Sequence, residues 1–77
     1  MVTVALTDIE SVDRSELSDK RLNDLQNGYS SFDEVLKNSN DPIALDKSST
    51  PYRIIDGRHR IYLARKNDYR SVNVRFI

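Results

Sequence analysis

Five consecutive residues, Asp56-Gly57-Arg58-His59-Arg60, hold the side chains of this sequence that are best suited to chemistry. They combine two guanidinium groups with a carboxylate and the only imidazole of the chain. A guanidinium group can hold two phosphate oxygens at once, and an imidazole exchanges a proton near neutral pH. These residue types predict a site for an anion, and phosphate is the anion that suits them best.

The surrounding residues predict the strand, turn and helix that position this pentapeptide. Tyr52, Ile54 and Ile55 suit a buried, pleated strand, and Gly57 can adopt a backbone conformation that other residues reach only at a cost. A helix is expected from Arg58 to about residue 67 or 68. The first N–H groups of a helix have no partner inside it, and its dipole makes that end partly positive. The expected helix start and the basic side chains therefore favour the same ligand.

Each residue of the pentapeptide has a functional and a structural interpretation. Arg60 could contact phosphate or form a salt bridge to Asp56, and His59 could donate to phosphate, act as acid or base, or only pack under the turn. Asp56 could orient His59, hold a metal together with phosphate oxygens, act as a base, or accept the free helix N–H groups. Gly57 lets a ligand approach the backbone, and Arg58 could make an exposed anion contact.

The remaining elements predict an α+β domain. Residues 2–7 alternate as a strand, and a helix over 19–27 is expected to be capped by Ser18 and to end at a left-handed Gly28. Ser31 and Glu34 have the spacing of a capping box for a helix over about 32–38. Further strands are expected at 42–45 and 72–76. The sequence thus predicts a single domain over residues 1–77, with about three helices and a mixed sheet of about four short strands.

Composition limits the classes of function. The chain has 77 residues, of which 31% are charged and 38% hydrophobic, as in a soluble globular domain. It has no cysteine, which excludes disulfides, thiolate metal sites and thiol catalysis. No apolar run approaches the roughly 18 residues of a membrane span and no signal peptide is visible, so we expect a cytoplasmic protein without a membrane partner.

The net charge of zero conceals an asymmetry. Residues 1–50 carry ten acidic against five basic side chains, and residues 51–77 carry seven basic against two acidic ones. A basic face that meets a polyanion is one interpretation, and mutual neutralisation of the two halves within the fold is the other.

Several segments together resemble the ParB/sulfiredoxin-like superfamily, and specifically the N-terminal domain of ParB-type proteins. The pentapeptide carries much of the likeness. The other segments that resemble the family, in chain order, are Val4-Ala5-Leu6-Thr7-Asp8-Ile9, residues 22–28, Asp41-Pro42-Ile43-Ala44-Leu45, residues 52–57, residues 58–64 and Ser71-Val72-Asn73-Val74. The resemblance implies a small ParB/sulfiredoxin-like fold over nearly the whole chain.

The resemblance also implies a ligand. In ParB proteins a Gly-x-Arg-Arg region binds a nucleoside triphosphate, and Gly57, His59 and Arg60 occupy the corresponding places, with His59 in place of the first arginine. In sulfiredoxins the residue before His-Arg is the catalytic cysteine; here it is Arg58, which excludes that activity. Relatives with Asp-Gly-x-His-Arg include free-serine kinases, proposed nucleases, toxin domains and proteins of DNA-modification systems.

These observations give one main hypothesis and two alternatives. The main hypothesis is a module of a prokaryote, phage or mobile element that binds a nucleotide, for example a nucleoside triphosphate with Mg²⁺, or a nucleic-acid backbone, through Gly57, Arg58, His59 and Arg60. One alternative is a small nuclease, toxin domain or phosphotransferase in which Asp56 and His59 are catalytic. The other is a regulatory or inhibitory domain that binds a protein partner.

Two further groups of side chains have open roles. The tyrosines could stack on bases or pack in the core and at its rim; they are Tyr29, Tyr52, Tyr62 and Tyr69. The acidic residues of the N-terminal part are a solvated face or contain the carboxylate that a kinase or nuclease needs; they are Asp8, Glu10, Asp13, Glu16 and Asp19.

Overall fold

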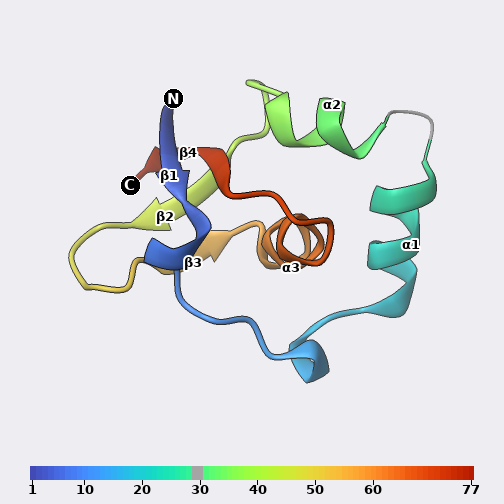
Figure 1. Ribbon diagram of the computed structural model, residues 1–77, viewed down its shortest axis with the longest axis horizontal. Helices are drawn as coiled ribbons and strands as arrows, with labels where there is room; N and C mark the ends of the chain where they lie inside the picture. The colour runs from blue at the N-terminus through green and yellow to red at the C-terminus, as the bar shows by residue number, and fades with distance from the viewer. Residues whose placement is uncertain (29–30) are drawn as a thin grey trace.

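Four strands form one mixed sheet in the computed structural model, which describes residues 1–28 and 31–77. They are β1 (Val2–Ala5), β2 (Ile43–Asp46), β3 (Arg53–Asp56) and β4 (Ser71–Phe76), in the spatial order β1-β4-β2-β3. β4 pairs antiparallel with β1 and parallel with β2, and β2 pairs antiparallel with β3. With three helices among the described residues, the α+β class and the mixed four-stranded sheet predicted from the sequence are confirmed (Figure 1).

The helices are α1 (Asp19–Asn27), α2 (Phe32–Lys37) and α3 (Arg58–Lys66). α1 packs against α3, and Figure 1 shows α3 nearly end-on between the sheet and α1. Both predicted N-caps are present: the Ser18 hydroxyl accepts from the Arg21 N–H at 3.4 Å, and the Ser31 hydroxyl accepts from the Glu34 N–H at 3.2 Å. Each cap satisfies a backbone donor that the helix itself leaves free.

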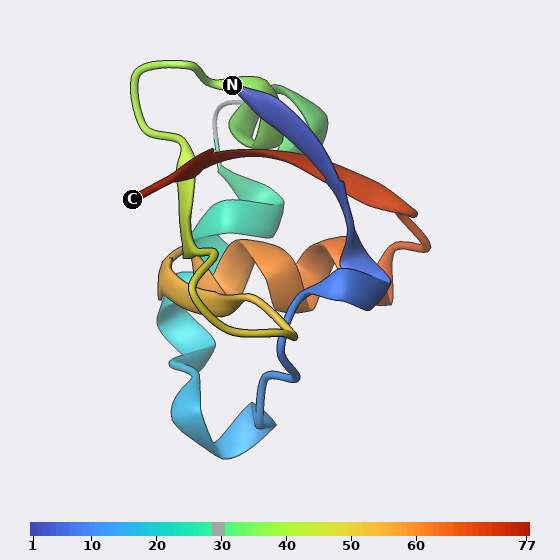
Figure 2. The same cartoon turned by 90° about the vertical axis from the view of Figure 1, so that its left-hand side faces the viewer.

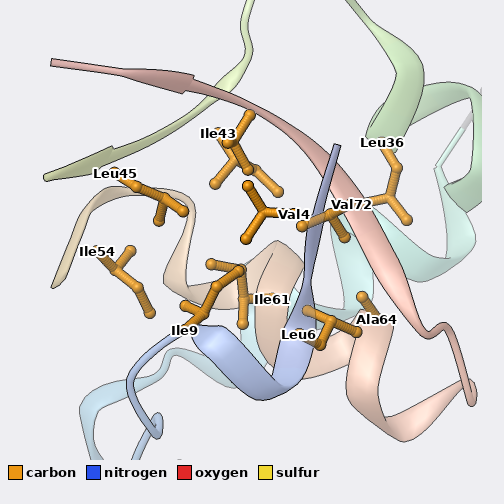
Figure 3. Packing of buried hydrophobic residues seen from close by; sticks show 11 residues of the cluster. Val4, Leu6, Ile9, Leu36, Ile43, Leu45, Ile54, Ile61, Ala64 and Val72 are labelled. Atoms are coloured by element: carbon orange, nitrogen blue, oxygen red, sulfur yellow. The ribbon is translucent and has the colours of Figure 1, made fainter. Parts of the chain in front are cut away.

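The hydrophobic core lies between one face of the sheet and α3 (Figure 3). Alternate strand residues point to this face, as the pleat of a strand requires, and Leu45 and Val74 are fully buried there. From the other side, Ile61 and Ala64 of α3 are also fully buried. The alternating and helical spacings of apolar residues in the sequence thus converge on one layer, which holds α3 in place beneath the sheet.

Three local predictions were wrong. The first strand ends at Ala5, because Leu6–Asp8 form a short 3₁₀ helix, η1, where a strand had been expected to continue. Gly28 has an extended backbone, with φ −76° and ψ −173°, and not a left-handed one. Ile55 is 51% exposed, because it follows the buried Ile54 in a strand and so points to the opposite face.

α1 has the expected bounds, and the remaining boundaries lie within two residues of the expected ones. A second 3₁₀ helix, η2 (Arg14–Glu16), lies in the connection before α1. Figure 2 shows η1 and η2 on the path from β1 to α1. Tyr29 lies outside the described residues. No helix in the described ranges has the length and apolar character needed to cross a membrane.

Candidate functional site

The pentapeptide forms the junction between β3 and α3. β3 ends at Asp56, Gly57 has φ 112°, and α3 begins at Arg58, as the sequence predicted. A Cβ atom at Gly57 would lie 3.0 and 3.2 Å from two side-chain carbons of Ile43. Positive φ and this close approach both require glycine here, so the turn is tight and packs directly on β2.

A cavity of about 650 Å³ opens in front of this junction. All five residues of the pentapeptide line it. The other lining residues come from α1, α2, the segment before β2 and the end of β3; they are Arg21, Leu25, Glu34, Val35, Asn38, Asp41 and Ile55. The structure therefore brings every predicted site residue to one cavity, whose size lies in the range of small-molecule sites.

The N-terminus of α3 faces this cavity without a side-chain cap. Gly57 occupies the N-cap position and has no side chain to accept from the first helical N–H groups. Its carbonyl oxygen accepts from the Ile61 N–H at 2.9 Å, so the helix itself is regular from its first residue. Asp56, which the sequence suggested as a possible acceptor for these N–H groups, makes no such bond. The first turn thus presents backbone donors and the positive end of the helix dipole to the cavity.

Arg60 is buried and already paired. The residue is 7% exposed, and its Nη1 donates to the carbonyl oxygen of Asp41 at 2.5 Å. Its Nη2 lies 3.6 Å from a carboxylate oxygen of Asp56 and 3.9 Å from one of Asp41. The structural alternative for Arg60, an ion pair with Asp56 that fixes the turn, is therefore present. A phosphate contact by Arg60 stays a prediction, and it requires an exchange of these partners.

His59 connects α3 to α1. Its Nε2 accepts a hydrogen bond from the backbone N–H of Ser18 at 3.0 Å. Burial lowers the pKa of His59 below its usual value, and the positive charges of Arg21 and Arg14 lower that pKa further. The imidazole is therefore held neutral, with the proton on Nδ1, because a protonated Nε2 cannot accept a hydrogen bond.

Arg58 lies between two acidic side chains that the sequence could not single out. Its Nη1 donates to the carbonyl oxygen of Ile54 at 3.2 Å. Its Nη2 lies 3.9 Å from Glu10, and its Nε lies 3.7 Å from Glu16. The Arg58 side chain is 41% exposed, so solvent screens both ion pairs and the guanidinium can exchange partners.

Asp56 is the more exposed of the two predicted catalytic residues, with 63% of its side chain accessible. Its only ion pair in the described ranges is the one with Arg60, and it makes no hydrogen bond to His59. No group of three metal-ligating side chains comes together anywhere in residues 1–28 and 31–77. The site therefore offers basic groups and backbone donors more clearly than it offers an acid–base pair.

Arg21 is a site residue that sequence reasoning missed. It lies on α1, is exposed, and lines the cavity opposite the pentapeptide. Within the described residues it has no carboxylate at ion-pair distance, although it is close enough to His59 to lower the pKa of the imidazole. Local sequence gave no signal for this placement, because it depends on the packing of α1 against α3.

The described tyrosines do not line this cavity. Tyr69 packs edge-on against Phe32, Tyr52 packs against Phe76, and the ring of Tyr62 lies under the guanidinium of Arg14. These three tyrosines therefore pack against other side chains of the protein, which is the structural one of the two roles that the sequence allowed.

Comparison with known proteins adds no relative. No protein-family model matches the chain, and no curated protein and no solved structure matches it either.

Proposed function

We propose that the cavity at the β3–α3 junction binds the phosphate group of a nucleotide or of a nucleic-acid backbone. The observation that carries this proposal is the uncapped N-terminus of α3, which opens onto a cavity that arginine side chains line. Backbone donors and the helix dipole favour a phosphate there, and guanidinium groups add charge and paired donors. The resemblance of the pentapeptide to ParB-type sequences points to the same class of ligand.

The contacts divide the site into binding groups and supporting groups. Arg21 is exposed and can reach a ligand freely, whereas Arg58 is partly exposed and reaches one by exchanging its ion pairs with Glu10 and Glu16. Arg60 holds the turn between Asp41 and Asp56, and His59 fixes α3 against the start of α1. A nucleoside triphosphate would bring Mg²⁺ with it, bound through its own phosphate oxygens. We place this role in the cytoplasm of a prokaryote or in a phage or mobile element.

An NMR titration tests the proposal directly. The ¹⁵N-labelled chain is titrated with inorganic phosphate, ATP, CTP and a short DNA oligonucleotide, each with and without Mg²⁺. We expect amide shifts that saturate and that concentrate at Gly57, Arg58 and His59, together with a shift of the Arg21 side-chain Nε–H. The ranking of the ligands then distinguishes a nucleotide site from a backbone site. Absence of saturable shifts at these positions at about 5 mM ligand contradicts the proposal, because such a site would be weaker than physiological use requires.

A pair of arginine variants separates a local contact from general charge. Arg21→Gln removes one cation from the cavity, and Arg75→Gln removes one from an exposed position of β4 that lies outside it. We expect Arg21→Gln to weaken phosphate binding about tenfold, as for loss of a charge-assisted hydrogen bond, and Arg75→Gln to leave it within about twofold. Equal weakening by both variants indicates non-specific attraction of an anion to positive charge anywhere on the protein surface.

The catalytic alternative has less support in the geometry. His59 Nε2 is occupied by the Ser18 N–H, and Asp56 does not orient the imidazole. A nuclease or phosphotransferase would show Mg²⁺-dependent turnover that His59→Ala abolishes without unfolding the chain. The protein-binding alternative predicts that none of the four titrated ligands causes saturable amide shifts at the cavity.

A further inference from the structure

The outer edge of β1 has backbone hydrogen-bonding groups without a partner in residues 1–28 and 31–77. β1 is the terminal strand of the sheet, and Figure 2 shows it crossing in front of β4. The Leu6 N–H donates to the Arg70 carbonyl at 2.9 Å, and the register places Val4 opposite Val72 and Thr3 opposite Asn73. In an antiparallel ladder, hydrogen-bonded and non-hydrogen-bonded pairs alternate. The backbone groups of residues 2, 4 and 6 therefore face β4, whereas those of Thr3 and the N–H of Ala5 face outward.

This edge is short, but it lacks the other common protections against pairing, namely charges, proline and a bulge. Its sequence, Val2-Thr3-Val4-Ala5, contains no charged residue and no proline, and its register with β4 runs without a bulge. Natural edge strands avoid pairing through such charges, prolines and bulges. Val2 is also 49% exposed although it lies on the same face of the strand as the buried Val4.

The opposite edge of the sheet is protected, which makes the contrast clear. β3 carries Arg53 and Asp56, and its outward Ile54 N–H is bound by a carboxylate oxygen of Glu10 at 2.6 Å. Next to it, Tyr52 forms a bridge with Ile9. Side chains and a bridging segment thus close one edge, and β1 is the edge that is left open in the described part of the chain.

We propose that β1 pairs with β1 of a second copy of this chain, in antiparallel orientation about a two-fold axis, to give one continuous sheet of eight strands. An axis beside Thr3 places the outward N–H and C=O of each Thr3 opposite those of the other copy. The same register sets Val2 of each copy across from Val4 of the other, on the core face of the sheet, so that the exposed part of Val2 is covered. The outward N–H of Ala5 then meets the carbonyl of Met1 in the other copy.

A second copy fits this edge better than an unrelated strand. A two-fold contact needs a surface that complements itself, and two outward Thr3 backbones satisfy that requirement directly. The edge is uncharged and the whole chain has a net charge of zero, so neither local nor long-range repulsion opposes association. The contact is short, which predicts a weak dimer with a dissociation constant on the order of 100 µM.

Sedimentation equilibrium of the full chain, over about 10 µM to about 1 mM, measures this association. We expect the average mass to rise from that of the monomer toward twice that value across this range. Ala5 has φ −66°, which proline also adopts, and its N–H makes no bond to any described residue, so Ala5→Pro removes an outward donor without straining the strand. Ala5→Pro should stay a monomer at the highest concentration, and Ala5→Ser, which keeps the N–H, should associate like the parent chain.

An independent measurement uses the unaltered sequence. In a mixture of ¹³C-labelled and unlabelled chains, the proposed register predicts an intermolecular Hα–Hα contact between Val2 and Val4. A monomer at the highest concentration, a dimer that Ala5→Pro leaves intact, or intermolecular contacts elsewhere on the surface overturns the proposal. The proposal is also overturned if β1 pairs with an added extended peptide in preference to β1 of a second copy.

Discussion

The Nε2 atom of His59 accepts a hydrogen bond from the backbone N–H of Ser18 at 3.0 Å, across 41 positions of sequence. Ser18 is the N-cap of α1, and His59 lies in the first turn of α3. One bond thus joins the starts of two helices. It also sets the protonation of the imidazole, because only the neutral ring can accept at Nε2.

The stability of the protein should therefore depend on pH between neutrality and mild acid. The pKa of His59 is lowered by burial and by the charges of Arg21 and Arg14, so the unfolded chain binds a proton at a higher pH than the folded protein does. The stabilising contribution is present above the unfolded pKa, about 6.5, and is lost as the pH falls through the folded pKa. Urea unfolding at a series of pH values from about 7.5 to about 5 measures the loss.

His59→Gln is the matched control for this dependence. A glutamine amide oxygen can accept from the Ser18 N–H, and it does not titrate. We expect the variant to keep most of the stability at pH 7.5 and to show a nearly flat profile down to about pH 5. Three carboxyl groups, those of Asp13, Asp33 and Asp46, have a pKa below the usual value of 3.8. They therefore stay ionised from about pH 7.5 to about pH 5 and do not contribute to the slope measured there. An unchanged slope in His59→Gln assigns the pH dependence to another group.

Loss of Arg60 should destabilise the fold. Arg60→Met keeps much of the side-chain volume but leaves the Asp41 carbonyl without its donor and two carboxylates without their partner. We expect the free energy of unfolding to fall by about 2–4 kcal/mol. Arg58→Met, two positions earlier, should cost only about 1 kcal/mol, because it loses one hydrogen bond to the Ile54 carbonyl and two partly exposed ion pairs. Similar losses in the two variants would mean that burial of Arg60 contributes little.

Gly57 should tolerate no side chain. Gly57→Ala forces a Cβ into a backbone with φ 112° and within 3.0 Å of Ile43. A residue held in such a region costs about 1–3 kcal/mol, so we expect a loss of at least about 2 kcal/mol once the contact is included. The neighbouring exposed position provides the comparison: Ile55→Thr keeps a β-branched side chain and should change stability by less than about 1 kcal/mol. Thermal unfolding of both variants, followed by circular dichroism, checks the difference.

Arg65 should hold η1 against α3. Its Nη2 donates to the carbonyl oxygens of Leu6 and Ile9 at 3.0 and 2.8 Å, and its burial lowers the pKa of the guanidinium. Arg65→Met removes both donations and should cost about 2 kcal/mol, with faster hydrogen exchange at the Ile9 amide. Arg70→Met changes an exposed arginine of the same region and should leave that exchange rate unaltered.

The sequence was sufficient where structure is set by neighbours along the chain. The strand, the glycine turn and the helix around Gly57 follow from short-range preferences and apolar spacing, and so do the N-caps at Ser18 and Ser31. The alternating residues of β4 likewise indicated which side chains enter the core. These features need no knowledge of distant segments.

The sequence was insufficient where a polar side chain finds a partner far away in the chain. The bond of His59 to Ser18 and the contacts of Glu10 with the Ile54 N–H and with Arg58 join segments that are at least 41 positions apart. The burial of Arg60 under the turn has the same origin, because its acceptor is at residue 41. Residue type alone suggested Arg58, His59 and Arg60 as ligand contacts. Tertiary packing gives each of these side chains a hydrogen-bond partner within the protein as well.

The placement of β4 has a consequence for how the chain folds. β4 is the last of the four described strands along the chain, yet it lies between β1 and β2 and supplies the ladder partners of both. During synthesis on a ribosome, β1 therefore remains without its neighbour until residues 71–76 have left the exit tunnel. Native pairing over such sequence separation is slow to start compared with local contacts. The sheet is therefore expected to form in one step once β4 has emerged, and until then β1 is open to wrong strand pairs.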